Sequence, residues 1–196
     1  MSPSRRGPPR LRPGCVYRTR DLRRWARNTS RLVSECLESG QLVKLAGGLY
    51  ACPRKSRFGA LPPTDDAVMR AFLGRSRYVF TGPESWNPLG LGSTAMFASR
   101  LVYNTKRSGE FQFGNKRFVL RRVRFPRKPT PEWFAVDLLE NHGMAGVELG
   151  VLETNLSGAL LAGRFDQDRL VRMAEEFGTQ ATQALVKRAR AATGRE

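Results

Sequence analysis

Residues 15–53 constrain the fold most strongly, because two helical patterns are followed there by two short strand patterns. Leu22, Trp25 and Ala26 have the spacing of one face of a helix that begins near Thr19. The Arg-Asn-Thr-Ser sequence that follows is typical of a turn and a helix cap, since its short polar side chains accept hydrogen bonds from free helical N–H groups. The pattern therefore predicts a short helix, a turn and a second helix.

The second helix is predicted to end at Gly40, because glycine readily adopts the left-handed conformation that follows a helix. Its apolar stripe consists of Leu32, Val33, Cys36 and Leu37. Arg31 and Ser34 fall on the other side of the same helix. We therefore expect the stripe to be buried and these two polar side chains to face outward.

Two strands are predicted next, over residues 41–45 and 49–52. Gly47-Gly48 lies between them and permits the positive φ angles of a tight hairpin. The order of helix, turn, helix and hairpin is that of a winged helix-turn-helix, whose second helix enters the major groove of DNA. The alternative is a small helical subdomain with a hairpin that packs on the rest of the protein.

The charge of the chain favours the DNA-binding interpretation. The formal net charge is +17 and the isoelectric point is about 11.2, which favours an anionic partner such as nucleic acid or a membrane surface. A hydrophobic content of 40% is that of a folded protein. Because we find neither an apolar run of about 18 residues nor an apolar signal-peptide core, we expect a cytoplasmic protein without a membrane span.

The N-terminus carries much of this charge. Residues 1–31 contain ten arginines and a single acid, Asp21. Residues 1–13, rich in arginine, proline and glycine, are predicted to be a flexible basic arm. Residues 54–63 are predicted to be a linker, which places the domain boundary near residue 58.

The candidate DNA contacts lie on the two helices and the hairpin, where cations and small polar groups can reach phosphates or base edges. They are Arg18, Thr19, Arg20, Arg27, Asn28, Thr29, Ser30, Arg31, Ser34, Lys44, Gly47 and Gly48. The positive end of the second helix adds N–H donors for phosphate. Two-fold operator sites suit two such modules, so we expect a dimer on DNA.

The rest of the chain predicts a mixed domain. A helix capped by Thr64 comes first, and four strands and four helices follow. The predicted strands cover 77–81, 97–103, 110–113 and 117–125, and the predicted helices cover 131–141, 152–162, 166–177 and 179–192. The whole chain is therefore predicted to be α+β, with an N-terminal winged helix-turn-helix (14–58) and a mixed α/β domain whose C-terminal part is helical (59–196).

A second basic patch is predicted on these strands. Residues 100–128 contain ten lysines and arginines and one acid, Glu110. The candidate members of the patch are Lys116, Arg117, Arg121, Arg122 and Arg124. Phe118, Leu120 and Val123 are expected to supply the buried side of the same segment. The patch leaves open an RNA-binding or nuclease function.

Catalytic and metal chemistry find little support in the sequence. The three cysteines lack a Cys-x-x-Cys spacing, and the single histidine, His142, is distant from them in sequence. His142 also has no nucleophilic residue at a sequence spacing that is typical of a catalytic pair. We therefore expect three reduced thiols, no metal, no cofactor and no enzymatic activity.

Three segments of the chain resemble a known family. They are Thr19-Arg-Asp-Leu22, the stretch from Leu32 through Gly40-Gln-Leu-Val-Lys-Leu-Ala-Gly-Gly-Leu-Tyr50, and Gly82-Pro-Glu-Ser-Trp-Asn-Pro-Leu-Gly-Leu91. Together they are similar to the AbiEi-type antitoxins of bacterial type IV toxin–antitoxin systems, over roughly residues 15–145. The resemblance implies a winged helix that represses its own promoter at inverted repeats. It also implies a C-terminal domain (59–196) that counteracts a partner nucleotidyltransferase toxin.

The chain departs from this family pattern at Trp86 and Pro88, and no leading helix is evident before Thr19. A stand-alone winged-helix transcription regulator without a toxin is the main alternative function. An RNA-binding protein that acts through residues 100–128 is the other.

Overall fold

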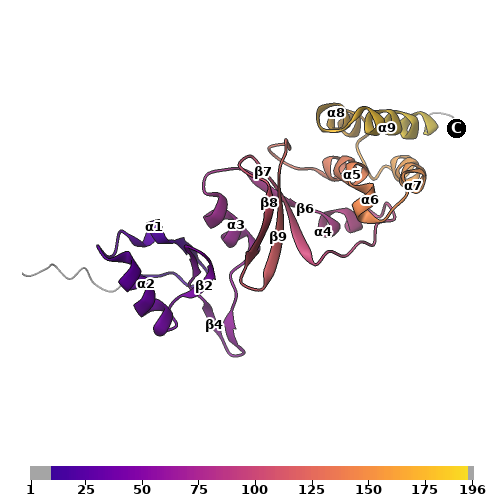
Figure 1. The fold of residues 1–196 in the computed structure, drawn as a ribbon. Helices are drawn as coiled ribbons and strands as arrows, with labels where there is room; N and C mark the ends of the chain where they lie inside the picture. The colour runs from indigo at the N-terminus through magenta and orange to yellow at the C-terminus, as the bar shows by residue number, and fades with distance from the viewer. Residues whose placement is uncertain (1–9, 194–196) are drawn as a thin grey trace, which may run out of the picture. The chain divides into compact units, whose positions relative to one another are not determined.

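The computed structural model describes residues 10–193 of the chain (Figure 1). Helices occur together with several β-sheets, which confirms the predicted α+β class. The chain divides into two compact units, one of residues 1–77 with 111–117 and one of 78–110 with 118–196. Most of the arm predicted over residues 1–13 lies outside the described residues, which begin at Arg10.

The first unit contains two helices and a three-stranded antiparallel sheet. In chain order these are β1 (Val16–Arg18), α1 (Thr19–Leu22), α2 (Thr29–Glu38), β2 (Val43–Ala46) and β3 (Leu49–Ala51). Strand β3 lies in the middle of the sheet, between β1 and β2. Strand β1, whose Tyr17 pairs with Tyr50 of β3, was not predicted.

The predicted apolar stripe of α2 is confirmed. Val33 and Cys36 are buried and Leu32 and Leu37 are half-buried. The stripe packs in a core that also holds Leu22 of α1, which is 1% exposed. Burial of this one face orients α2, so the opposite face of the helix is exposed.

The first helix is shorter than predicted. Helix α1 ends at Leu22 after four residues, and a turn that carries Trp25 follows it. Trp25 packs edge-to-face on Tyr17, with ring centroids 5.9 Å apart. Leu22 and Trp25 therefore both pack in the core, as their spacing predicts, but Trp25 lies in a turn and not in a helix.

The prediction of a linker over residues 54–63 was wrong, because residues 54–61 form an antiparallel hairpin. Strands β4 (Arg54–Ser56) and β5 (Gly59–Leu61) pair from Arg54 with Leu61 to Ser56 with Gly59. The Ser56 hydroxyl donates to the Gly59 carbonyl at 2.9 Å and accepts from the Phe58 N–H at 3.2 Å. Gly59 has a φ angle of 108°, which a side chain disfavours.

Helix α3 (Asp65–Leu73) belongs to the first unit, so the division lies after Arg77 rather than near residue 58. The predicted cap is present, since Thr64 Oγ1 accepts from the Ala67 N–H at 3.2 Å. The aromatic ring of Phe72 packs on Phe111 and Phe113, with centroids 4.8 and 4.7 Å away. Because of these contacts, residues 111–117 belong to the first unit.

A four-stranded sheet has the strand order β6-β7-β9-β8, and it lies in the second unit except for residues 111–117. The strands are β6 (Tyr78–Thr81), β7 (Ser99–Asn104), β8 (Gly109–Phe113) and β9 (Lys116–Arg122). Helix α4 (Pro83–Trp86) and a 3-10 turn, η1 (Asn87–Leu89), follow β6. Phe118 and Leu120 are buried as expected, but β9 ends before Val123, which is 40% exposed.

Helices α5 to α9 complete the second unit and lie on one side of this sheet (Figure 1). They are α5 (Pro131–Glu140), α6 (His142–Ala145), α7 (Leu149–Leu161), α8 (Gln167–Phe177) and α9 (Gln180–Ala192). The short helix α6 was not predicted; it follows directly after the C-cap of α5, Asn141. A core that includes Trp86, Trp133 and Leu156 joins these helices to β7. Within the described residues, no helix has the length and apolar character needed to span a membrane.

Candidate nucleic-acid interface

The first turn of α2 combines exposure with positive electrostatic character. Asn28 caps the helix, since its Oδ1 accepts from the Arg31 N–H at 3.0 Å. Ser30, Arg31 and Ser34 are exposed on the face opposite the core, and Thr29 is half-buried. No acid occurs in this first turn, so the partial positive charge of the helix N-terminus is not offset there.

The Arg31 side chain can exchange its present hydrogen-bond acceptor for one on a ligand. It is 78% exposed, and its Nε donates to Glu35 Oε1 at 2.9 Å along the helix. An exposed ion pair at this spacing contributes only about 0.3–0.5 kcal/mol. A phosphate or a guanine edge can therefore replace Glu35 at little cost.

The β2–β3 hairpin lies beside these helices. Lys44 and Gly47 are exposed, whereas Gly48 is half-buried with a φ angle of 70°. The Gly48 carbonyl accepts from the Thr19 N–H at 3.0 Å, which holds the turn against the start of α1. The outer strand is also covered in part, since the Leu45 carbonyl accepts from the Gly114 N–H at 2.9 Å. Lys44 and Gly47 thus remain the accessible members of the hairpin.

The predicted arginines of the first helix differ in their surroundings. The guanidinium of Arg18 donates to the Phe72 carbonyl, so this side chain is engaged inside the first unit and is withdrawn from the predicted phosphate contacts. Arg20 is exposed, with its Nε 3.7 Å from Asp21 Oδ1, and Arg27 is exposed in the turn before α2. Thr19 is half-buried.

The second basic patch is divided between the two units. Lys116 and Arg117 belong to the first unit, and Lys116 Nζ lies 2.6 Å from Asp65 Oδ1. In the second unit Arg121 donates to Asn141 Oδ1 at 2.9 Å, which uses its guanidinium inside the protein. Arg122 and Arg124 are exposed. Four of the five cations lie on strand β9, but Lys116 and Arg121 are engaged with Asp65 and Asn141.

The hairpin β4–β5 adds cations in the segment that was predicted to be a linker. Arg54, Lys55 and Arg57 are exposed on it, and the Phe58 ring at its turn is 84% exposed. The Ser-x-x-Gly spacing of residues 56–59 was the available signal for a turn in this segment. Arg24 was also missed, and its guanidinium lies 4.0 Å from the Trp25 ring centroid.

A buried polar network occupies the second unit. The carboxylate of Asp137, on α5, accepts from Thr81 Oγ1 and, at 2.8 Å, from Trp86 Nε1. Asn141 Nδ2 donates to Tyr103 Oη at 2.9 Å and to Asp137 Oδ1 at 3.1 Å. Burial raises the pKa of both Asp137 and Tyr103 above their ordinary values. The network joins β6, α4, β7 and α5.

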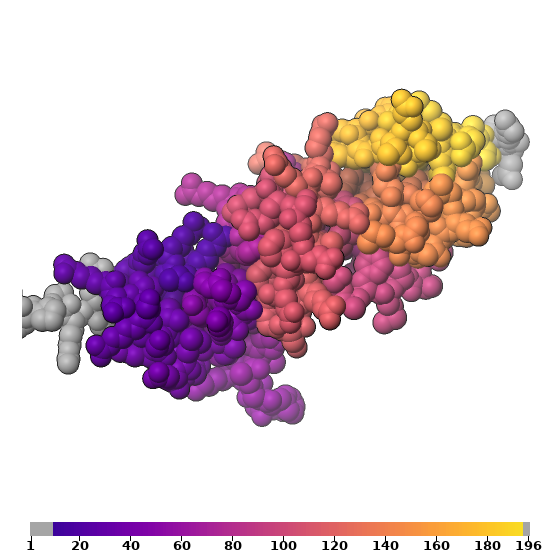
Figure 2. All heavy atoms as spheres, in the orientation of Figure 1, coloured from indigo at the N-terminus to yellow at the C-terminus, as the bar shows by residue number. Residues whose placement is uncertain are grey.

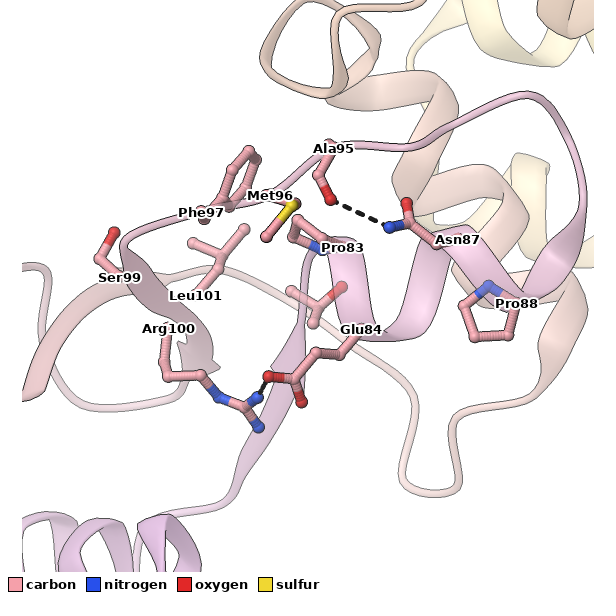
Figure 3. A pocket seen from close by; sticks show the side chains of 11 residues that line it. Pro83, Glu84, Asn87, Pro88, Ala95, Met96, Phe97, Ser99, Arg100 and Leu101 are labelled. Carbon is pink, nitrogen blue, oxygen red and sulfur yellow. Dashed lines mark hydrogen bonds and ion pairs between the residues drawn. The ribbon is translucent and has the colours of Figure 1, made fainter.

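The Gly82–Leu91 segment borders a pocket of about 340 Å³ (Figure 3). Asn87 Nδ2 donates to the Ala95 carbonyl at 2.9 Å and closes one side of the pocket. The Glu84 carboxylate is paired with the Arg100 guanidinium, so each of these two charges at the pocket is neutralised by the other. Met96 at the rim is 92% exposed.

The residues that could hold a metal are dispersed. Cys36 and Cys52 are buried and Cys15 is half-buried, all as free thiols in the first unit. His142 Nδ1 lies 3.3 Å from the Val147 carbonyl in the second unit. Among residues 10–193, no three histidine, cysteine or acidic side chains are grouped closely enough to hold a metal ion.

Comparisons of the chain with protein-family models, curated proteins and solved structures gave no match.

Proposed function

We propose that α1, α2 and the β2–β3 hairpin of the first unit form a winged helix-turn-helix that binds duplex DNA. Helix α2 is the recognition helix and the β2–β3 hairpin is the wing. The observation that carries this proposal is the exposed first turn of α2, with Ser30 and Arg31 opposite a buried Val33 and Cys36. A helix held in this way can enter a major groove while its core face stays packed.

The charge distribution supports the same proposal. Arg20, Arg27 and Lys44 are exposed around the two helices and the hairpin, where they can contact phosphates. Arg18 has no part in this proposal, because its guanidinium is bound to the Phe72 carbonyl. A net charge of +17 adds long-range attraction to any polyanion.

Fluorescence anisotropy of the full chain tests this proposal. The probe is a duplex from the region upstream of the chain's own gene, and an unrelated duplex of the same length is the control. We expect the upstream duplex to bind at least about 10-fold more tightly than the control, since specific sites exceed non-specific DNA by large factors. Equal affinity for the two duplexes would contradict sequence-specific binding.

We propose further that the protein represses its own promoter and acts as an antitoxin against a nucleotidyltransferase toxin. Support for this part comes from the resemblance of residues 15–145 to AbiEi-type antitoxins. Co-expression with an adjacent nucleotidyltransferase reading frame should restore growth that the frame alone suppresses. Persistent growth arrest would favour a stand-alone transcription regulator instead.

RNA binding through residues 100–128 is less well supported. Two of its five candidate cations, Lys116 and Arg121, already contact Asp65 and Asn141. The exposed Arg122 and Arg124 remain the best probes of this function. If Arg122→Ala and Arg124→Ala weaken duplex DNA binding no more than about 2-fold but abolish RNA binding, the second function is established beside the first.

A further inference from the structure

The hairpin β4–β5 has an unusual combination of charge and apolar exposure. Its strands and turn, residues 54–61, carry Arg54, Lys55 and Arg57 and no acidic residue. Figure 1 shows the hairpin labelled β4 extending away from the sheet of the first unit, and Figure 2 shows this purple segment standing out from the surface. The hairpin is therefore a basic projection rather than a covered element of the core.

An aromatic ring lies at the end of this projection. Phe58 is 84% exposed, in the two-residue turn between β4 and β5. Its backbone is held by Ser56 Oγ, and the Arg57 guanidinium lies 4.6 Å from its ring centroid. The large exposed ring thus lies on a hydrogen-bonded turn, with cations close to it in the same hairpin.

Such a combination suits the minor groove of a duplex. Proteins that bind there insert apolar side chains between base steps while nearby arginines and lysines contact the backbone. A membrane surface would also attract cations, but a single aromatic ring on a short two-stranded hairpin buries little apolar area in lipid. The observations therefore favour a kinked base step as the target of Phe58.

The position of the hairpin on the first unit fits this target. Its base and the turn that follows α2 line one pocket, to which Gly40, Gln41, Arg54 and Leu61 contribute. The hairpin and α2 therefore belong to the same compact unit, which lets both contact one duplex.

We propose that Phe58 is a wedge that enters the minor groove next to the major groove occupied by α2, with Arg54, Lys55 and Arg57 on the flanking phosphates. This inference rests on the proposed function, since it places the hairpin on the same duplex. It adds a second contact site and a mode of recognition that depends on how easily the base step deforms.

Changes in DNA topology test the wedge. A closed circular plasmid that carries the upstream region is relaxed by topoisomerase I with the full-length protein bound, and its linking number is read on a gel after the protein is removed. An inserted wedge unstacks and unwinds the step, so the wild-type protein should shift the linking number in proportion to occupancy. Phe58→Ala should lose at least about half of this shift at equal occupancy and bind about 10-fold more weakly.

Matched variants separate the wedge from general effects. Phe58→Leu keeps an apolar wedge and should retain the shift, and Met96→Ala removes an apolar side chain that is 92% exposed in the second unit and should change nothing. A full shift with Phe58→Ala would overturn the inference. So would tighter binding of the wild type to a single-stranded oligonucleotide than to the duplex.

The wild-type measurement distinguishes this inference from the proposed function. If the wild-type protein leaves the plasmid and the upstream duplex unbound at low salt, the proposed function fails and this inference fails with it. If it binds both but leaves the linking number unchanged, only the wedge is excluded.

Discussion

The indole Nε1 of Trp86 donates a hydrogen bond of 2.8 Å to Asp137 Oδ2 inside the second unit. Trp86 lies in the Gly82–Leu91 segment and Asp137 lies on α5, so this bond ties the segment to the helical part of the unit. Both side chains are buried, at 0% and 5% exposure. A buried carboxylate with several donors stabilises the fold only while its partners remain in place.

Replacing Asp137 should therefore be costly. Asp137→Ala leaves Trp86 Nε1 and Thr81 Oγ1 without their acceptor, and we expect it to lower the free energy of unfolding by about 3 kcal/mol. Urea unfolding followed by tryptophan fluorescence measures this value. Asp168→Ala is the control, because Asp168 is an exposed partner of Arg190 and its loss should cost less than about 1 kcal/mol. Equal losses for the two variants would contradict the importance of the network.

The same carboxyl should also make stability depend on pH. Burial raises the pKa of Asp137, although hydrogen bonds from Thr81 and Trp86 oppose the shift. A raised folded-state pKa adds stability that is fully present below the unfolded pKa of about 3.9 and is lost as pH rises through the folded pKa. Asp137→Asn cannot titrate. The unfolding free energy of the wild type minus that of this variant should thus fall as the pH rises above about 4. A constant or rising difference would refute the assignment.

The turn of the β2–β3 hairpin offers a paired test of backbone conformation. Gly48 has a φ angle of 70°, and an added Cβ would lie 3.4 Å from Thr19 Oγ1. Gly47 does not have a positive φ angle, and an added Cβ would meet no atom within 4 Å. We expect Gly48→Ala to lower the free energy of unfolding by about 1–2 kcal/mol and Gly47→Ala to leave it within about 0.5 kcal/mol. Thermal unfolding of the two variants measures this difference in stability. A larger loss for Gly47→Ala than for Gly48→Ala would contradict the prediction.

The cysteines of the first unit should react slowly in the folded protein. Burial raises the pKa of the Cys36 and Cys52 thiols, so little thiolate is present at neutral pH. In a Cys15→Ser variant, both remaining thiols should react with Ellman's reagent at least about 10-fold more slowly than in urea. Rapid modification without denaturant would show that the core of the first unit opens easily.

Local chemistry explains which elements could be predicted from the sequence. Helix α2 was predicted because its cap at Asn28 and its stripe from Leu32 to Leu37 lie within a few residues of each other. The exposure of Arg31 and Ser34 followed from the same periodicity. Strand β1 was missed because three residues carry little pattern and this strand is defined by pairing with β3, more than 30 residues later.

Long-range contacts account for the remaining differences. Arg18 was predicted to contact phosphate, but its guanidinium is bound to the carbonyl of Phe72, 54 positions along the chain. Arg121 was placed in a basic patch, but it bonds to Asn141, whose position depends on α5. Basic composition alone made residues 54–63 look like a linker, although Ser56 and Gly59 form a hydrogen-bonded turn.

The most direct measurement of the central claim is the salt dependence of DNA binding for the wild type and Arg31→Ala, with Arg75→Ala as an exposed control on the loop after α3. If Arg31 contacts a phosphate from α2, its removal should weaken binding and reduce the slope of log affinity against log salt by about one. Arg75→Ala should keep the wild-type slope and affinity to within about 2-fold. Identical affinities and slopes for all three proteins would contradict the placement of α2 on DNA.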